Sequence, residues 1–401
     1  MNTLLLAATA AFLFLAPFSG SAGLRVAMLL IAALALLIER GRAKFASAPR
    51  IPHAIAIAYG AWVLLACASV AWSELPRYTL AELRAEILYG TLAFAVFFFA
   101  ATDAARWRWW WTAIIVGTLT VLVATQLQQR IPVELSRHPL DGGPGYYSTH
   151  LVLVAPLLLV LAWPAPWGQE RHATVQAAAL LLLLAAAWDT ENRIVWAAFG
   201  AELLAAYALS RAMPAVDAQR RRNLRRATLV AAAAVIVAFG ASIVERNQRL
   251  FTSASPVTTG IERDVRPRIW SVAWEEFKAA PWLGHGFGRE ILAAKFLPHT
   301  PKTFQHPPLR HSHNAFVDIA LQLGATGLAI FVALMAALVR EYRGFLRDPA
   351  VAPLGVIGIT LIAGFLVKNL TDDFLYRHNA LIFWSLNGML LGLGRLARRA
   401  P

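Results

Sequence analysis

The sequence predicts an all-α polytopic membrane protein with about twelve transmembrane helices and one large outer loop that contains short helices. Of its 401 residues, 58% are hydrophobic and 15% are charged, and the mean hydropathy is +0.54. This composition is typical of a protein that lies in a bilayer. Apolar runs of roughly 17–22 residues, each able to cross about 30 Å of hydrocarbon as a helix, recur from end to end. Basic residues fall mainly in alternate short loops.

Each expected span follows one apolar run. The runs cover residues 3–17, 23–38, 52–71, 86–102, 111–125, 149–163, 174–188, 194–209, 227–245, 315–339, 352–368 and 378–394. The first run lacks a basic segment before it and a second run follows at once, so it predicts an uncleaved helix and not a signal peptide. The single cysteine, Cys67, lies inside an apolar run and excludes a disulfide framework and a thiolate metal site.

The basic residues predict the orientation of the chain. There are 37 Lys+Arg against 23 Asp+Glu, and the loops after the even-numbered spans carry most of the arginines. The positive-inside rule then places both termini in the cytoplasm. The basic run "RRRNLRR" at 220–226 is interpreted as a topology anchor, so no nucleic-acid partner is expected. We expect residues 1–401 to form a single integral membrane domain.

The exception to the short loops is the segment 246–314, between the ninth and tenth spans and on the outer face. Long loops of this kind are uncommon unless they are functional. Within it, "IWSVAWEEFKAAPWLG" predicts an amphipathic helix that either lies at the membrane interface or packs against other helices. Its apolar face would carry Ile269, Trp270, Ala273, Trp274 and Phe277.

The stretch "HSHN", residues 311–314, ends this loop where an inward-running helix begins. Ser312 or Asn314 can cap that helix, whose first backbone N–H groups then face outward. The positive end of the helix dipole favours a bound anion and disfavours an imidazolium. His313 is therefore a candidate proton acceptor, with His311 as its neighbour, although a histidine that only caps or packs is the alternative.

Arginines form the second group of candidates. Arg193, in "DTENRIVWAAF", stands between two apolar spans, where it must either snorkel or meet a partner. Arg263, Arg266 and Arg268, in "IERDVRPRIW", lie in the long loop. Planar guanidinium groups bind phosphate oxygens in paired hydrogen bonds, which suits a diphosphate, whereas a solvated basic face is the alternative.

Carboxylates complete the set. Asp372 and Asp373, in "NLTDDFLYRHN", can orient a histidine or an arginine, or can be solvated. The chain contains no Asp-x-Asp pair, HExxH helix, GxSxG elbow or cysteine-based site. We therefore expect chemistry on a phosphate-bearing lipid without a metal or another cofactor, in which arginines meet the charge of the diphosphate.

Four short motifs, "ENRIVW", "RPRIW", "PWLGHGFG" and "HSHN", resemble those of the bacterial O-antigen ligases. This family lies within the superfamily of O-antigen polymerases and O-oligosaccharyltransferases. The resemblance implies a large periplasmic loop and an active site on the periplasmic side of the inner membrane. It also assigns roles to individual residues. The essential histidine is His313, beside Asn314; the arginine edge is Arg193; the loop arginine is Arg266 or Arg268; the acidic position is Asp372 or Asp373. Asn192 and Ile194 depart from the usual serine and small residue of the arginine edge.

Such a family member would transfer a finished polysaccharide from undecaprenyl diphosphate to a sugar hydroxyl of the lipid A core, with inversion and without a metal. Its partners would be the lipid-linked glycan, the lipid A-core acceptor and membrane lipids. An O-antigen polymerase and a protein O-oligosaccharyltransferase are alternatives in the same superfamily. A lipid-linked sugar transporter is an alternative from another class, but it would place charged groups near mid-membrane, whereas these candidates lie at one face. A binding or scaffolding membrane protein is a further alternative.

Overall fold

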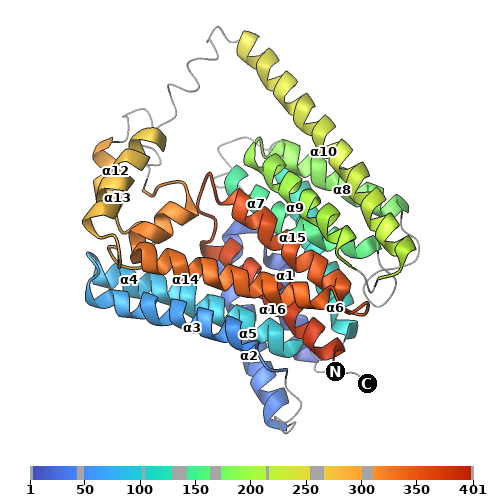
Figure 1. The fold of residues 1–401 in the computed structure, drawn as a ribbon, viewed down its shortest axis with the longest axis horizontal. Coiled ribbons are helices and arrows are strands. Elements are labelled where there is room, and N and C mark those ends of the chain that lie inside the picture. The colour runs from blue at the N-terminus through green and yellow to red at the C-terminus, as the bar shows by residue number, and fades with distance from the viewer. Residues whose placement is uncertain are drawn as a thin grey trace.

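The computed structural model describes residues 3–42, 49–101, 104–128, 142–162, 173–213, 216–252, 266–299 and 310–398 (Figure 1). Within these residues the structure is helical and holds no strand, so the predicted all-α class is confirmed. Arg263 of the predicted basic cluster lies outside the described residues.

Each predicted apolar run falls on a helix. The helices are α1 (Thr3–Leu15), α2 (Ala22–Arg42), α3 (His53–Ala68), α4 (Pro76–Glu82), α5 (Tyr89–Ala100), α6 (Ala104–Gln128), α7 (Pro144–Val154), α8 (Ala173–Asp189), α9 (Ile194–Arg211), α10 (Ala218–Thr252), α12 (Arg266–Ala279), α13 (Ala293–Phe296), α14 (Ala315–Phe345), α15 (Ala352–Lys368) and α16 (Arg377–Ala397). A π-helical segment, Leu83–Leu88, joins α4 to α5, and a 3-10 helix, Ala155–Ala162, continues α7.

The chain is a multi-pass membrane protein. Eight helical segments of the described structure are long and apolar enough to cross a bilayer, and three apolar helices, among them α1, are shorter. The 13 residues of α1 reach only about 20 Å as an α-helix. The run predicted at 149–163 changes to a 3-10 helix at Ala155, next to Pro156, which cannot donate a backbone hydrogen bond. The count of twelve spans and the side on which the long loop lies therefore remain predictions.

Helix α14 is kinked at Gly324, which has a φ of 68°. The segment from Pro281 to Gly286 runs beside this kink and pairs with the backbone groups that the kink exposes. The N–H groups of His285 and Gly286 donate to the carbonyls of Leu321 and Gln322 (2.9 and 3.0 Å), and Ala325 donates to Pro281 (2.8 Å). A Cβ atom at position 284 would lie 2.5 Å from the Gln322 backbone, so this approach requires glycine. The predicted long loop is thereby attached to a membrane helix.

Helix α12 confirms that the aromatic segment packs against other helices, and its position at the membrane interface stays a prediction. Ile269 and Ala273 are buried against residues of α13 and α14, whereas Trp270 and Trp274 are 41% and 58% exposed. The indole N–H of Trp270 also donates to the carbonyl of Ser312 (2.8 Å). One side of α12 therefore packs on the helix bundle, and its tryptophans are available to a membrane surface.

The turn between α15 and α16 lies against the start of α14. The backbone N–H of Ala315 donates to the carbonyls of Asn369 (3.1 Å) and Asp372 (3.2 Å), and the Asn314 side chain donates to the carbonyl of Leu370 (3.0 Å). These bonds bring "TDD" and "HSHN" together, although they are about sixty positions apart in the chain.

Candidate active site

The "HSHN" stretch forms the N-terminal cap of α14. The Asn314 side-chain oxygen accepts from the N–H groups of Phe316 (3.0 Å) and Val317 (3.2 Å), so Asn314 is the capping residue of the two considered. Ser312 is buried, and its N–H donates to the carboxylate of Asp318 (2.8 Å). Both residues hold the two histidines in place.

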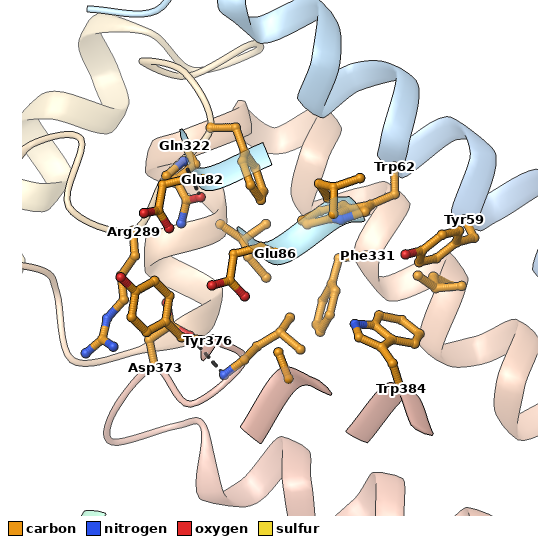
Figure 2. Close-up of a pocket in the computed structure, with 17 residues that line it drawn as sticks. Tyr59, Trp62, Glu82, Glu86, Arg289, Gln322, Phe331, Asp373, Tyr376 and Trp384 are labelled. Atoms are coloured by element: carbon orange, nitrogen blue, oxygen red, sulfur yellow. Dashed lines mark hydrogen bonds between the residues drawn. The ribbon is translucent and has the colours of Figure 1, made fainter. Parts of the chain in front are cut away.

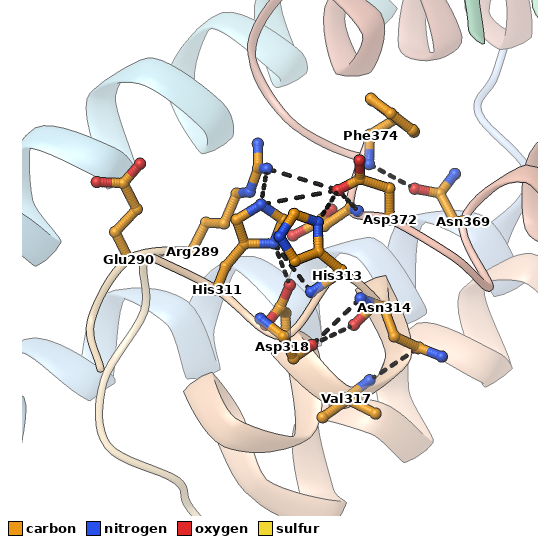
Figure 3. A network of polar contacts seen from close by, with 12 residues as sticks. Arg289, Glu290, His311, His313, Asn314, Val317, Asp318, Asn369, Asp372 and Phe374 are labelled. Atoms are coloured by element: carbon orange, nitrogen blue, oxygen red, sulfur yellow. Dashed lines mark hydrogen bonds and ion pairs between the residues drawn. The ribbon is translucent and has the colours of Figure 1, made fainter. Parts of the chain in front are cut away.

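His313 adopts a left-handed backbone conformation with a φ of 56°, which is uncommon for a residue other than glycine. Its Nδ1 lies 3.2 Å from Oδ1 of Asp372, and its ring lies 4.2 Å from that of His311, centroid to centroid (Figure 3). Its Nε2 is buried and has no hydrogen-bond partner among the residues that the structure describes. When Nδ1 carries the proton that Asp372 accepts, Nε2 presents a free lone pair.

The other histidine is engaged at both nitrogens. Nε2 of His311 contacts the guanidinium of Arg289, which can only donate, so this nitrogen accepts. Nδ1 lies 3.3 Å from the Asp318 carboxylate and also accepts the backbone N–H of His313 (3.2 Å). Arg289 also lies 3.8 Å from Asp372 and 4.7 Å from the centre of the Tyr376 ring. The geometry thus distinguishes His313, which has one free nitrogen, from His311.

The pKa values of the two neighbouring aspartates, Asp372 and Asp373, are shifted in opposite directions. Burial opposes ionisation of Asp372, but the hydrogen bond from His313 and the charges of His311 and Arg289 outweigh it and hold the pKa of this carboxyl below its usual range. Burial, with the nearby charge of Asp318, raises the pKa of Asp373. Asp372 is therefore the carboxylate in contact with His313, whereas the Asp373 side chain accepts from the backbone of Leu375 (3.2 Å).

The predicted arginines occupy three places. Arg266 is the half-buried first residue of α12, and its charge acts on Lys368 at the end of α15. Arg268 is exposed on α12, and Arg193 is exposed just before α9. Helix α9 packs against α15, where Gly364 meets Glu202, and Val367 packs with the cluster that contains Val195 and Trp196. This antiparallel packing places the start of α9 at the same end of the bundle as Lys368. That Arg193 and Arg266 share one pocket with His313 stays a prediction.

Two cationic residues of this region, Lys368 and Arg289, were not predicted from the sequence. Lys368 is fully buried, its Nζ has no hydrogen-bond partner in the described part of the chain, and it lies 4.3 Å from the centre of the Phe374 ring. The Asp372 carboxylate acts on its charge. The sequence signal that could have identified Lys368 is that it is a single lysine at the end of an apolar run. For Arg289, the signal was its position directly after the glycine-rich turn.

A cleft lies beside Arg289, which contacts His311 (Figure 2). It contains about 640 Å³ of empty space, part of which is open to solvent. Carboxylates and Arg289 line one end, and aromatic rings line the other. Its labelled lining residues are Tyr59, Trp62, Glu82, Glu86, Arg289, Gln322, Phe331, Asp373, Tyr376 and Trp384. No sequence pattern indicates this cleft, because its residues come from five separate segments.

Two groups of side chains have the composition of metal sites. His311, His313 and Asp372 offer ligand atoms within 4.8 Å of one another, as do Glu74, Glu276 and His285. In the first group Arg289 already contacts both His311 and Asp372. In the second, the Lys295 ammonium lies 3.0 Å from Glu74 and 2.5 Å from Glu276. A cationic side chain thus offsets the carboxylates in each group, which fits an ion-pair network better than a metal site.

Comparison with known proteins agrees with the motifs. Residues 177–332 match the family model described as O-antigen ligase, a segment that includes Arg193, Arg266, Arg289 and His313. No curated protein matches the chain. Members of this family are glycosyltransferase-like enzymes whose partners are lipid-linked glycans and membrane lipids. The match confirms the resemblance of these motifs to the O-antigen ligase superfamily.

Proposed function

We propose that the protein is an O-antigen ligase of the bacterial inner membrane, which transfers a polysaccharide from undecaprenyl diphosphate to the lipid A-core oligosaccharide. The observation that carries the proposal is the pairing of His313 with Asp372, which leaves the second ring nitrogen of His313 without a partner in the described structure. A histidine held in this way is suited to act as a general base on an acceptor hydroxyl.

The transfer is a single displacement. Neutral His313 takes the proton of the acceptor hydroxyl at Nε2, and the hydroxyl oxygen forms a bond to the anomeric carbon. The bond from that carbon to the diphosphate oxygen breaks, and its electron pair leaves with the diphosphate. Attack opposite the leaving group inverts the anomeric carbon. Asp372 keeps the imidazole in the required tautomer and stabilises the imidazolium that forms.

Cations stabilise the leaving group. Arg266 and Arg193 bind the diphosphate and offset the negative charge that grows as the glycosidic bond breaks, with Arg268 as a further candidate. The charge of Arg266 acts on Lys368, on which the Asp372 carboxylate also acts, and this supports the role. The donor carries its own activated leaving group, so the reaction requires no nucleotide and no metal. The site faces the periplasm, and both termini lie in the cytoplasm.

The test is an in vitro reaction that contains the purified protein, a lipid-linked glycan and core lipid A, with the product sizes resolved. Capture of whole chains by lipid A is the expected result. Stepwise lengthening on the lipid carrier would instead identify a polymerase, and transfer to an added peptide would identify a protein O-oligosaccharyltransferase. Movement of the lipid-linked glycan across a vesicle bilayer without transfer would identify a transporter.

A further inference from the structure

The cleft beside Arg289 contains a buried carboxylate oxygen that has no hydrogen-bond partner in the described part of the chain. Glu82, at the end of α4, is 2% exposed, and its Oε1 accepts from the Arg377 guanidinium (2.7 Å). Its Oε2 is buried and has no hydrogen-bond partner among the described residues. A buried acceptor of this kind is costly unless a ligand or water donates to it. The open atom of Glu82 therefore points to a ligand that carries a hydrogen-bond donor.

The backbone around Glu82 departs from regular geometry on both sides of the cleft. Directly after Glu82 the chain forms the π-helical segment Leu83–Leu88, a rare geometry that is frequent at functional sites. Across the cleft, Arg377 begins α16 with a φ of 49°. The Arg377 N–H donates to both carboxylate oxygens of Glu86 (3.0 and 3.1 Å). Glu82 and Glu86 thus both accept from Arg377, the first residue of α16.

The polar end of the cleft is continuous with the proposed catalytic pair. Arg289 lines the cleft and contacts His311, and Asp373 lines it directly after Asp372 in the chain (Figures 2 and 3). A ligand in this cleft lies next to the residues that position His313.

The lining determines the class of the ligand. Trp62, Trp384 and Tyr59 form the aromatic end, where Tyr59 and Trp384 meet edge to face at 5.2 Å. Sugars pack their C–H faces on such rings and donate hydroxyl protons to carboxylates. Three carboxyl groups and Arg289 form the other end, where they offer hydrogen-bond partners to sugar hydroxyls.

We infer that this cleft binds a neutral sugar residue of the acceptor glycan, with a sugar hydroxyl donating to Oε2 of Glu82. This inference rests on the proposed function, because it identifies the glycan as the acceptor in the transfer. It separates the two substrates in space: the anionic leaving group belongs with the arginines, and the attacking sugar belongs with the carboxylates and aromatic rings.

The experiment measures binding of the core oligosaccharide, released from lipid A, to the purified full-length protein by tryptophan fluorescence. In Glu82→Gln the amide oxygen can keep the bond from Arg377, so an NH₂ group that cannot accept replaces Oε2. The variant is expected to weaken this binding by about 10- to 100-fold, the usual effect of losing a hydrogen bond to a charged group. Binding of undecaprenyl diphosphate is expected to stay unchanged. Glu341→Gln is a matched control, because Glu341 pairs with Arg395 (2.7 Å) outside the cleft.

A second variant separates ligand binding from the ion pair. Arg377→Met removes the partner of Glu82 and leaves the carboxylate in place, so core-oligosaccharide binding should fall by less than a few fold. An equal loss in Arg377→Met and Glu82→Gln would overturn the inference, because the carboxylate would then act only through the fold. Unchanged binding in Glu82→Gln, or an equal loss of undecaprenyl diphosphate binding, would overturn it as well.

Failure of the inference is distinguishable from failure of the proposed function. Glu82-dependent binding of the oligosaccharide by a protein that performs no transfer would leave the cleft assignment intact and refute the ligase. Full transfer to lipid A by Glu82→Gln, with an unchanged KM for the acceptor, would support the ligase and refute the cleft assignment.

Discussion

Replacement of Asp372 by asparagine tests the pairing with His313 at a single atom. Oδ1 of Asp372 lies 3.2 Å from Nδ1 of His313 and also accepts the backbone N–H of Asp373 at 2.8 Å. In Asp372→Asn the amide oxygen can keep both bonds, whereas a rotated amide would direct its NH₂ group at the Asp373 N–H. The variant should therefore preserve the tautomer of His313 and lose only the charge.

The expected loss of kcat in Asp372→Asn follows from the difference between a charged and a neutral hydrogen bond. A hydrogen bond to a charged group contributes about 1.5–3 kcal/mol and a neutral one about 0.5–1.5 kcal/mol. The loss of about 1–1.5 kcal/mol in stabilising the imidazolium lowers kcat by about 5- to 15-fold. Asp372→Ala removes the acceptor altogether, so we expect a loss on the scale of general-base catalysis, about 10²- to 10⁴-fold.

The assay is the rate of transfer in vitro at saturating donor and acceptor, with undecaprenyl diphosphate binding as the control for folding. Asp348→Asn, a carboxylate beyond the end of α14, is a matched variant that should keep the rate of the unmodified protein. The expected order of rates is the unmodified protein, then asparagine, then alanine. Unmodified rates in both Asp372 variants would refute the pairing, and an asparagine variant as slow as the alanine variant would refute the tautomer argument.

Three further predictions concern charge. Arg266→Ala should weaken undecaprenyl diphosphate binding by about 10- to 100-fold, and the same change in Arg268→Ala decides whether Arg268 shares this role. Unchanged binding in Arg266→Ala would return this arginine to a solvated face. Chelation of divalent cations should leave transfer intact, and a loss that Mg²⁺ restores would contradict the metal-free mechanism. The pKa of buried Asp373 is raised, so its contribution to stability is lost as pH rises above the ordinary carboxyl pKa near 4. Asp373→Asn should therefore raise the melting temperature most at pH 7–8 and converge with the unmodified protein near pH 4; an equal difference at all pH values would refute this.

Local patterns predicted most of the helical structure. Each apolar run falls on a helix because burial of apolar side chains and backbone pairing within one segment both act locally. The cap at Asn314 followed from the same local reasoning. The number of spans was harder to predict, since helices such as α1 are shorter than the hydrocarbon layer and their depth depends on neighbouring helices.

The site was predicted where its residues carry a local signature and missed where tertiary packing creates it. His313 stands in a recognisable helix start, but its choice of Asp372 over Asp373 depends on the turn after α15. Arg289 reaches His311 only because the preceding glycine segment lies against the kink in α14. Glu82 and Arg377 are separated by 295 positions, so no sequence spacing could have indicated their ion pair.

The central claim is that His313 is the base, and the most direct measurement is the single-turnover rate of transfer by His313→Gln. Glutamine keeps a polar side chain of similar reach at the end of α14 but cannot accept the proton. The account predicts a rate at least about 100-fold below that of the unmodified protein, with undecaprenyl diphosphate and core-oligosaccharide binding retained. Transfer by His313→Gln at the unmodified rate would contradict it.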